Sequence, residues 1–438
     1  MRPSSGLVRG VLVVTILVGV SSLSFYTVEK AGLIRAVQSV CGWIDHEYVK
    51  RSEEPVQRFI KDCYKGARSD AELALSGRYG SDSRRALVTI LNEKLSVLRV
   101  SHLAVYAPDE TVAMWTGEGH RTGAKARIVD GELVISRVID GTPAARGGVR
   151  QGDVLISIDG IPIMDPYEVE LTSGVWEILK PDETRVNVPV YGEIIRDELE
   201  PYWSVKDERE DESRGHLRVL RVPSFLAQAF TGRAWESAQA EIASLRDRED
   251  RLILDLRGNP GGSVPAMLRL LGAVTCDRGL AGWIYRDQVP ETNDYEKYRI
   301  KDRIEIDLQL ERLERDGAIA IVPASSEACF KGRLGVLVDQ GTGSVSEIFA
   351  QAIKERPRSV VAGWRTAGHV VLARWFQVAG LSRDFTVSVP IALYRSSKGE
   401  ELERQGVSPD EILTDDLRRW RARRDPWIQD LSRLIESR

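Results

Sequence analysis

The sequence predicts an α/β protein made of an N-terminal helical region, a small β module and an α/β core. Three observations predict this class. Apolar residues recur at helical spacing from Lys30 to about Val97, short strands and turns follow from about Gly117 to Leu199, and strands alternate with helices from His216 onward. A chain of 438 residues, 42% of them hydrophobic, is long enough for two or three domains. We expect a leading segment at residues 1–29, the helical region at 30–116, the β module at 117–199 and the core at 200–438.

The leading segment has the composition of an export signal or of a single membrane anchor. Residues 10–28 carry no charge, and Arg2 and Arg9 precede them. Val20-Ser21-Ser22 is only a weak cleavage site, which favours an uncleaved anchor over a removed signal. Either interpretation places the protein outside the cytoplasm, in the bacterial periplasm or cell envelope. The anchored form would associate with the inner membrane through residues 10–28.

Composition also argues against several classes of function. The formal net charge is −4 with interleaved signs, so we expect no nucleic-acid partner. No cluster of Cys or His has metal-ligand spacing, and we expect neither a metal nor a cofactor. In an exported chain the four cysteines pair most simply as Cys41 with Cys63 and Cys276 with Cys329, and free buried thiols are the alternative.

The helical region ends in an amphipathic helix from Arg85 to Leu98, with Leu87, Leu91 and Leu95 on one side. This helix delivers the chain to Ser101 and His102, and we expect a strand directly afterwards.

The β module contains a run from Gly141 to Leu155 that resembles a bacterial PDZ module. Pro143 suits the first turn of a short helix, Gly152-Asp153 suits a tight turn, and Val154–Ile158 alternates as a half-buried strand. Such modules hold a peptide's C-terminal carboxylate on backbone NH groups and add the peptide to a sheet edge. Gly117–Val129 would supply the corresponding loop and strand. The alternative is a small β domain that only packs on the core.

In the core we expect strands at Leu217–Val222, Leu252–Leu256 and Leu334–Val338, and helices near Ala234–Leu245 and at Val264–Val274. The interval from Arg278 to Phe330 is long, charged and partly helical. It predicts an inserted surface element that shields a cleft.

Two motifs in the core carry the chemistry. An apolar strand opens into a glycine turn between Leu254 and Gly262, and Gly343-Ser344-Val345 follows much later. Glycine lets backbone NH groups approach an oxyanion beside a serine, which predicts acyl transfer with Ser344 as the nucleophile. The oxyanion donors would be the NH of Val345 and that of Gly262 or Gly261. In the structural alternatives, Ser344 or Ser346 only caps the next helix and the glycine turn only ends a buried strand.

Both motifs resemble those of the C-terminal processing (tail-specific) serine peptidases, a family that includes the tricorn core protease. The resemblance runs from about Val40 to Leu413. It implies an α/β peptidase core with an N-terminal helical domain and an inserted PDZ domain. It also implies serine endopeptidase activity on polypeptide substrates with a free C-terminus.

The resemblance departs from the tail-specific branch at the catalytic base. That branch has a lysine downstream of the serine, whereas the matching stretch here is Ala367-Gly368-His369-Val370. The tricorn-like branch instead has a histidine that follows a serine at the start of a strand, which Ser101 and His102 match. It also has a carboxylate near the C-terminus, which Glu403 matches just before the stretch Gly406-Val407-Ser408-Pro409-Asp410.

The predicted catalytic set is therefore Ser344, His102, Glu403 and Ser101. A neutral imidazole titrates near working pH and can accept the serine proton. Glu403 would accept a hydrogen bond, directly or through Ser101, and hold the productive tautomer. His369 is the alternative base, in a Ser344–His369 dyad. A second alternative is a catalytically inactive PDZ-containing scaffold on a protease fold.

Overall fold

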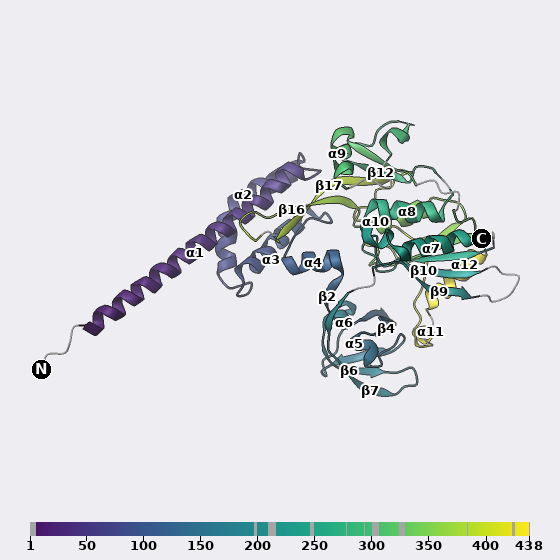
Figure 1. Ribbon diagram of the computed structural model, residues 1–438, viewed down its shortest axis with the longest axis horizontal. Coiled ribbons are helices and arrows are strands. Elements are labelled where there is room, and N and C mark those ends of the chain that lie inside the picture. The colour runs from purple at the N-terminus through teal and green to yellow at the C-terminus, as the bar shows by residue number, and fades with distance from the viewer. Residues whose placement is uncertain are drawn as a thin grey trace. The chain divides into compact units, whose positions relative to one another are not determined.

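The computed structural model describes residues 6–196, 199–208, 216–245, 249–276, 278–292, 294–299, 306–323, 329–382, 384–422 and 425–437, without the side chains of 6–25, 205–208 and 306–309. It divides into two compact units. Unit 1 comprises Met1–Thr111 and Val371–Ala392, and unit 2 comprises Val112–Val370 and Leu393–Arg438. Figure 1 labels the elements of both units. The mixed helix and sheet class predicted from the sequence is confirmed.

Unit 1 is built on the helices α1 (Gly6–Glu47), α2 (Glu54–Leu75) and α3 (Ser83–Leu95). Asp82 starts α3 because its carboxylate accepts the NH of Arg84 at 3.0 Å. The apolar faces of the three helices form one buried cluster. A short turn of 3₁₀ helix, η1 (Ser96–Leu98), leads to the expected strand, β1 (Ala104–Tyr106).

The expected leading segment falls within α1, which continues through residues 29 and 30 without a break. The side chains of residues 6–25 lie outside the described part of the chain. Where the structure is described, none of the helices combines the length and apolar character that crossing a bilayer requires.

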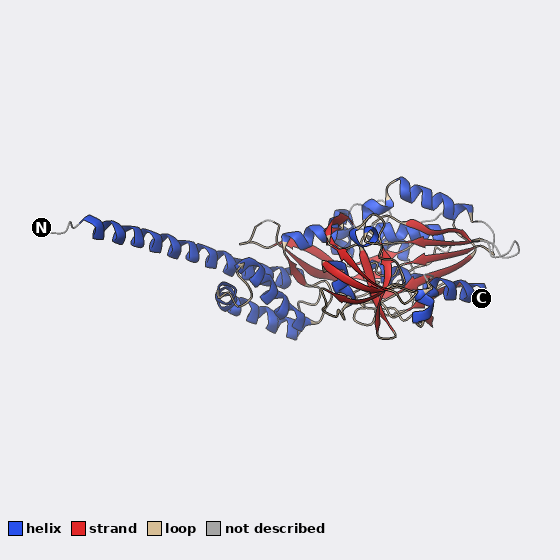
Figure 2. Ribbon diagram, turned by 90° about the horizontal axis from the view of Figure 1, so that it is seen from below, coloured by secondary structure: helices blue, strands red, loops and turns tan. Residues whose placement is uncertain are grey.

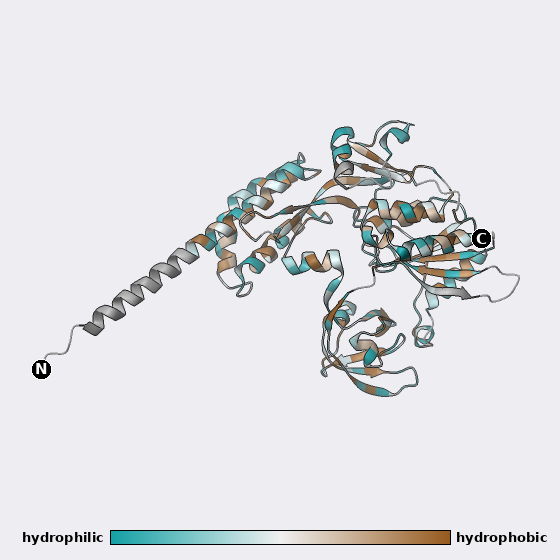
Figure 3. Cartoon of the chain, viewed as in Figure 1, coloured by the Kyte–Doolittle hydropathy of each residue, from teal (hydrophilic) through white to brown (hydrophobic). Residues whose placement is uncertain are grey.

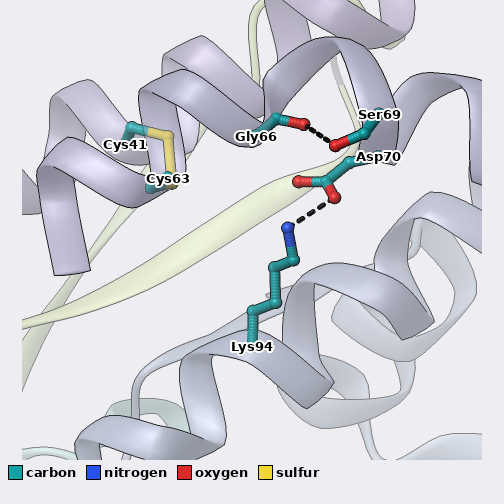
Figure 4. Close-up of a disulfide and its surroundings, with 6 residues drawn as sticks. All are labelled: Cys41, Cys63, Gly66, Ser69, Asp70 and Lys94. Carbon is teal, nitrogen blue, oxygen red and sulfur yellow. Dashed lines mark hydrogen bonds and ion pairs between the residues drawn. A yellow bond between two sulfur atoms is a disulfide. The ribbon is translucent and has the colours of Figure 1, made fainter.

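A disulfide joins Cys41 of α1 to Cys63 of α2, as expected (Figure 4). Near it, the buried carboxylate of Asp70 on α2 forms an ion pair with Lys94 on α3. A covalent bond and an ion pair thus connect the three helices across one side of the cluster.

Residues 371–392 group with unit 1, although the sequence interpretation placed them in the core at 200–438. They form β16 (Val371–Gln377) and the first part of β17 (Thr386–Ser396). β17 pairs antiparallel with β1, with Ala104 opposite Ser388, and Val387 and Val389 enter the buried cluster of the helices. Residues so distant in the sequence meet only through tertiary pairing, which local periodicity does not reveal.

The β module of unit 2 is an antiparallel five-stranded sheet in the order β3-β4-β5-β6-β7. Its strands are β3 (Ala124–Val129), β4 (Glu132–Val138), β5 (Val154–Ile158), β6 (Gly174–Leu179) and β7 (Arg185–Val190), its helices are α5 (Pro143–Arg146) and α6 (Pro166–Leu171), and β2 (Glu118–Arg121) pairs with β8 (Glu193–Arg196) beside them. Pro143 begins α5 and β5 has the predicted bounds. β3 is an edge strand, and α6 packs against it.

The C-terminal part of the chain holds the β module on the core. Trp420 of α11 (Leu417–Arg421) packs into a cluster with Val129, Val134 and Val154 of the module. From β3, the guanidinium of Arg127 lies over the rings of three tryptophans, with distances to the ring centroids of 4.3 to 5.3 Å. These tryptophans are Trp364, Trp420 and Trp427.

The core sheet has the order β18-β15-β14-β11-β10-β9, and all its strands are parallel except the edge strand β9. The strands are β9 (Tyr202–Glu208), β10 (Leu217–Arg221), β11 (Arg251–Asp255), β14 (Arg333–Val338), β15 (Ser359–Gly363) and β18 (Glu411–Ile412). Val219, Ile253 and Leu337 pack against α12 (Pro426–Glu436), so the alternate residues face the opposite side of the sheet. Figure 2 shows the helices and strands of the molecule and Figure 3 their hydropathy. The middle residues of the central strands, such as Leu252, Ile253 and Leu254 of β11, are buried and apolar, as expected of a parallel sheet with both faces covered.

The helices η2 (Ala227–Phe230), α7 (Arg233–Ser244), α8 (Val264–Val274) and α10 (Val345–Lys354) complete the core. The expected insertion contains β12 (Gly282–Tyr285), η3 (Tyr295–Tyr298), α9 (Ile306–Asp316) and β13 (Ala318–Ile321). β12 pairs with β13 and with the second part of β17. The second expected disulfide, Cys276–Cys329, joins the two ends of this insertion.

Candidate active site

The candidate site lies where three parallel strands end. β11, β14 and β15 are neighbours, so the loops that follow them leave the same carboxyl edge of the sheet. In open α/β sheets this edge is the usual place for a binding or catalytic site. The three loops are residues 256–263, 339–344 and 364–370.

Ser344 ends the second loop and immediately precedes α10. Its backbone has φ 56° and ψ −126°, whereas a serine that caps a helix has an extended backbone. A non-glycine residue with positive φ is strained and needs support from its surroundings. Part of that support comes from Gly343, whose NH donates to the carbonyl of Asn259 at 2.9 Å.

The glycine turn lies directly against Ser344. The buried side chain of Asn259 shapes this turn, because its amide donates to the Val222 carbonyl at 2.9 Å and its oxygen accepts the NH of Gly261 at 2.9 Å. Gly261 has φ 103°, and a Cβ placed there would lie 2.6 Å from the Cβ of Ser344. Only glycine permits this approach.

The three expected oxyanion donors differ in their hydrogen bonds. The NH of Gly261 is occupied by Asn259. Among the described residues, no acceptor is bonded to the NH of Gly262 or to that of Val345. Val345 begins α10, and the first NH groups of a helix have no partner within it.

We predict that Gly261→Ala strongly reduces the hydrolysis expected of this site. The added methyl group would meet the Ser344 side chain and the Val345 NH, and alanine is strained at a φ of 103°. The variant should lose at least about 10²-fold in kcat/KM, as expected for a displacement of about 1 Å at a catalytic group. Gly399→Ala is the matched control, because it has a positive φ of 90° and no heavy atom within 4 Å of the added Cβ. Equal activity of the two variants would contradict the prediction.

Glu347 is a site residue that the sequence interpretation missed. Its carboxylate is fully buried and accepts four hydrogen bonds, from the NH groups of Ser344, Gly368 and His369 at 2.7 to 2.9 Å and from the hydroxyl of Thr366 at 2.5 Å. Burial raises the pKa of Glu347, the four hydrogen bonds oppose that rise, and the pKa stays above its ordinary value. The sequence did contain a signal for this residue. A glutamate three positions after a serine at a helix start is the spacing of a capping box, in which the carboxylate accepts the NH of the serine.

His369 and Glu403 lie on segments that are bonded to each other in unit 2. The carboxylate of Glu403 accepts the NH of Val370 at 2.8 Å, and the NH of Arg404 donates to the carbonyl of Gly368 at 2.7 Å. The side chain of His369 is exposed, and that of Glu403 is half-buried.

Ser101 and His102 lie together in unit 1, in the turn between η1 and β1. His102 Nδ1 is 3.0 Å from Ser101 Oγ, and His102 has a positive φ of 59°. The side chain of Asn92 on α3 holds the adjacent strand, because it donates to the carbonyl of Val105 and accepts the NH of the same residue. Ser344 and His102 are two of the eight non-glycine residues with positive φ in the described part of the chain.

The structure thus brings Ser344, Gly261, Gly262 and Val345 together in unit 2 and Ser101 with His102 in unit 1.

Asp255 and Arg257 form a buried ion pair near the glycine turn, and Arg221 joins it. Arg221 and Arg257 are both 2.8 Å from the Asp255 carboxylate, and all three side chains are nearly buried. Burial raises the pKa of Asp255, but the two guanidiniums lower it by more than burial raises it. The pKa of Asp255 therefore lies well below its ordinary value. Together with Gly258 and Asp339, these residues line a cavity of about 1290 Å³ that reaches the β module. The candidate catalytic residues do not line it.

Comparisons with known proteins agree with this geometry. Residues 216–413 match the peptidase family S41 model, and residues 134–170 match a PDZ domain model. A carboxyl-terminal-processing protease of Synechocystis sp. is 24% identical over 353 residues, which cover 76% of this chain and 73% of the relative. The chloroplastic C-terminal processing peptidase of Tetradesmus obliquus is 26% identical over 372 residues, covering 77% and 71%.

The solved structure of mature CPAF has a TM-score of 0.61 at 14% identity, covering 93% of this chain and 97% of that one, a likeness that shows the fold. Fold and matches together define a serine peptidase with a PDZ domain. More narrowly, residues 216–413 match peptidase family S41, and the relatives that align with most of the chain are C-terminal processing peptidases. Polypeptides are accordingly its class of substrate.

Proposed function

We propose that the protein is an exported serine endopeptidase in which Ser344 is the nucleophile, His102 the general base and Glu403 the carboxylate that orients the base. Ser344 Oγ attacks the scissile carbonyl while His102 accepts its proton. The same imidazole then protonates the leaving amine, and water hydrolyses the acyl-enzyme. The backbone conformation of Ser344 beside the Gly261 turn carries this proposal.

The tautomer of His102 follows from its neighbour. His102 Nδ1 is 3.0 Å from Ser101 Oγ, so in this proposal Nδ1 carries a hydrogen that Ser101 Oγ accepts. The other ring nitrogen, Nε2, is then free of hydrogen and accepts the proton of Ser344. The Ser101 hydroxyl would then donate to Glu403. This chain keeps the imidazole oriented and stabilises its charged form.

The negative charge that develops on the carbonyl oxygen needs NH groups without other acceptors. Within the described residues, Gly262 and Val345 meet this condition and Gly261 does not. We therefore assign the oxyanion site to Gly262 and Val345, and we give Gly261 the role of permitting close approach to Ser344.

We further propose that the PDZ domain binds the C-terminus of the substrate. The edge position of β3 beside α6 supports this role, because a bound peptide can extend the sheet there. Exposed apolar side chains on both elements favour apolar residues in the peptide. These side chains are Ile128, Tyr167 and Leu171.

Export to the periplasm or cell envelope is part of the proposal. The two disulfides support it, since disulfides persist in oxidising compartments. Anchoring through residues 10–28 is the finer form of this proposal.

A fluorophosphonate probe followed by mass spectrometry tests the proposed activity. The probe should modify Ser344 in the folded protein and leave the Ser344→Ala variant unmodified. Binding of C-terminal peptides without any labelling would favour the scaffold alternative, and labelling at another serine would contradict the assignment.

The Ser344–His369 dyad remains the second candidate mechanism. One observation favours it, namely that Glu347 accepts the NH groups of both Ser344 and His369, which holds the two backbones near each other. Labelling that disappears in His369→Ala but persists in His102→Ala would establish the dyad.

A further inference from the structure

We infer that Glu347 is a positioning residue for the nucleophile, and that its ionised carboxylate is required to hold Ser344 in the reactive backbone conformation. This inference rests on the proposed function of Ser344. It concerns how that site is assembled and switched, and it adds no new catalytic group.

The hydrogen bonds of Glu347 account for the strained conformation next to it. One oxygen, Oε2, accepts the NH of Ser344 at 2.9 Å and that of His369 at 2.8 Å. A helix N-terminus would otherwise present the Ser344 NH without an acceptor inside the protein. An anion at this position also interacts favourably with the dipole of α10.

The other oxygen connects a third segment. Oε1 accepts the hydroxyl of Thr366 at 2.5 Å and the NH of Gly368 at 2.7 Å. The Thr366 oxygen in turn accepts the NH of Val407 at 2.7 Å. A single buried carboxylate therefore links the nucleophile to loop 366–369 and to the segment that contains Glu403.

Every partner of Glu347 is a hydrogen-bond donor, so the site requires a group that only accepts. An ionised carboxylate meets this requirement with both oxygens, whereas a protonated carboxyl would direct its own hydrogen toward an N–H or O–H group. One of the four hydrogen bonds would then break. Protonation of Glu347 should accordingly release part of the network that holds Ser344.

The protonation of Glu347 depends on its burial and hydrogen bonds, and not on a charged neighbour. The ionisable side chains on the contacting segments are Arg365, His369, Glu403 and Arg404, and among the described residues none of them contributes a charge interaction to the pKa of Glu347. Burial is the main cause of the raised pKa of Glu347. Because the folded-state pKa is raised, protonating this group favours the folded protein as the pH falls, and the loss of reactivity it causes is separate from acid unfolding.

The test compares fluorophosphonate labelling rates of the wild type, Glu347→Gln and Glu347→Asp across the pH range in which all remain folded by circular dichroism. Glutamine has the shape of glutamate but directs an NH₂ group at two donors, so labelling should slow by about 10²-fold. Aspartate keeps the charge and should recover part of the rate. Glu355→Gln, at the end of the same helix, is the matched control and should label like the wild type.

The pH profile separates positioning from a merely structural role. In acid, the wild type should lose reactivity through protonation of two groups, the base and Glu347, so the logarithm of its labelling rate should fall with a limiting slope of about two per pH unit. In Glu347→Gln only the base is protonated, and the slope should be about one. Equal rates and equal slopes in the wild type and Glu347→Gln would overturn the inference. Absence of Ser344 labelling in the wild type would instead overturn the proposed function.

Discussion

Replacing His102 by alanine should lower kcat/KM for peptide hydrolysis by about 10² to 10⁴-fold, the contribution expected of a general base. The proposed reaction requires His102 to remove the proton of Ser344, and a serine hydroxyl without a base is a weak nucleophile at neutral pH. The KM should change little, because His102 acts on the nucleophile and does not bind the peptide. Steady-state kinetics on a peptide with a free C-terminus measures both constants.

His369→Ala is the matched control, since it removes an exposed imidazole in the other candidate position. It should retain near wild-type activity, and added imidazole should restore part of the activity of His102→Ala by entering the vacated space. Loss of activity in His369→Ala with full activity in His102→Ala would reverse the assignment.

Asp255→Asn should produce the largest loss of stability. The substitution leaves the buried guanidinium of Arg221 beside a neutral amide, whereas Arg257 keeps its ion pair with Asp425. Breaking a buried ion pair in this way costs about 3 to 5 kcal/mol. Urea denaturation at neutral pH measures the difference in the free energy of unfolding. Glu193→Gln breaks an exposed ion pair with Arg146 in the same unit and should leave the transition midpoint unchanged.

The pH dependence of this effect follows from the lowered pKa of Asp255. Its stabilising contribution is fully present above the ordinary aspartate pKa of about 3.9 and is lost as the pH falls through the lower folded-state pKa. The difference between the wild type and Asp255→Asn should therefore be constant near neutrality and shrink only in strong acid. A difference that grows as the pH falls would contradict the proposed ion pair.

The parts of this protein that were predicted correctly depend on local pattern. The bounds of the strand Val154–Ile158 and the helix Val264–Val274 follow from apolar periodicity next to turn residues, and both are confirmed. The pairing Cys41–Cys63 was predictable because these two cysteines lie on successive amphipathic helices and each is the other's nearest cysteine in the sequence.

The parts that were not predicted depend on tertiary contacts. β17 joins β1 in unit 1, and Trp420 packs into the cluster of the PDZ domain; neither contact has a local signature. Glu347 was not predicted as a site residue, because nothing in the sequence shows that the loop at Thr366 and Gly368 folds over it. Ser344 was found through its glycine neighbours, whereas its strained backbone is visible only in the structure.

The central claim, that His102 serves Ser344, is tested most directly by a crystal structure of the protein with a phosphonate bound covalently to Ser344 Oγ. We expect His102 Nε2 within about 3 Å of that oxygen, the distance required of a general base, and the phosphonyl oxygen bonded to the NH groups of Gly262 and Val345. An adduct in which the imidazole of His369 occupies this position, or in which His102 lies out of hydrogen-bonding reach of Ser344 Oγ, would contradict it.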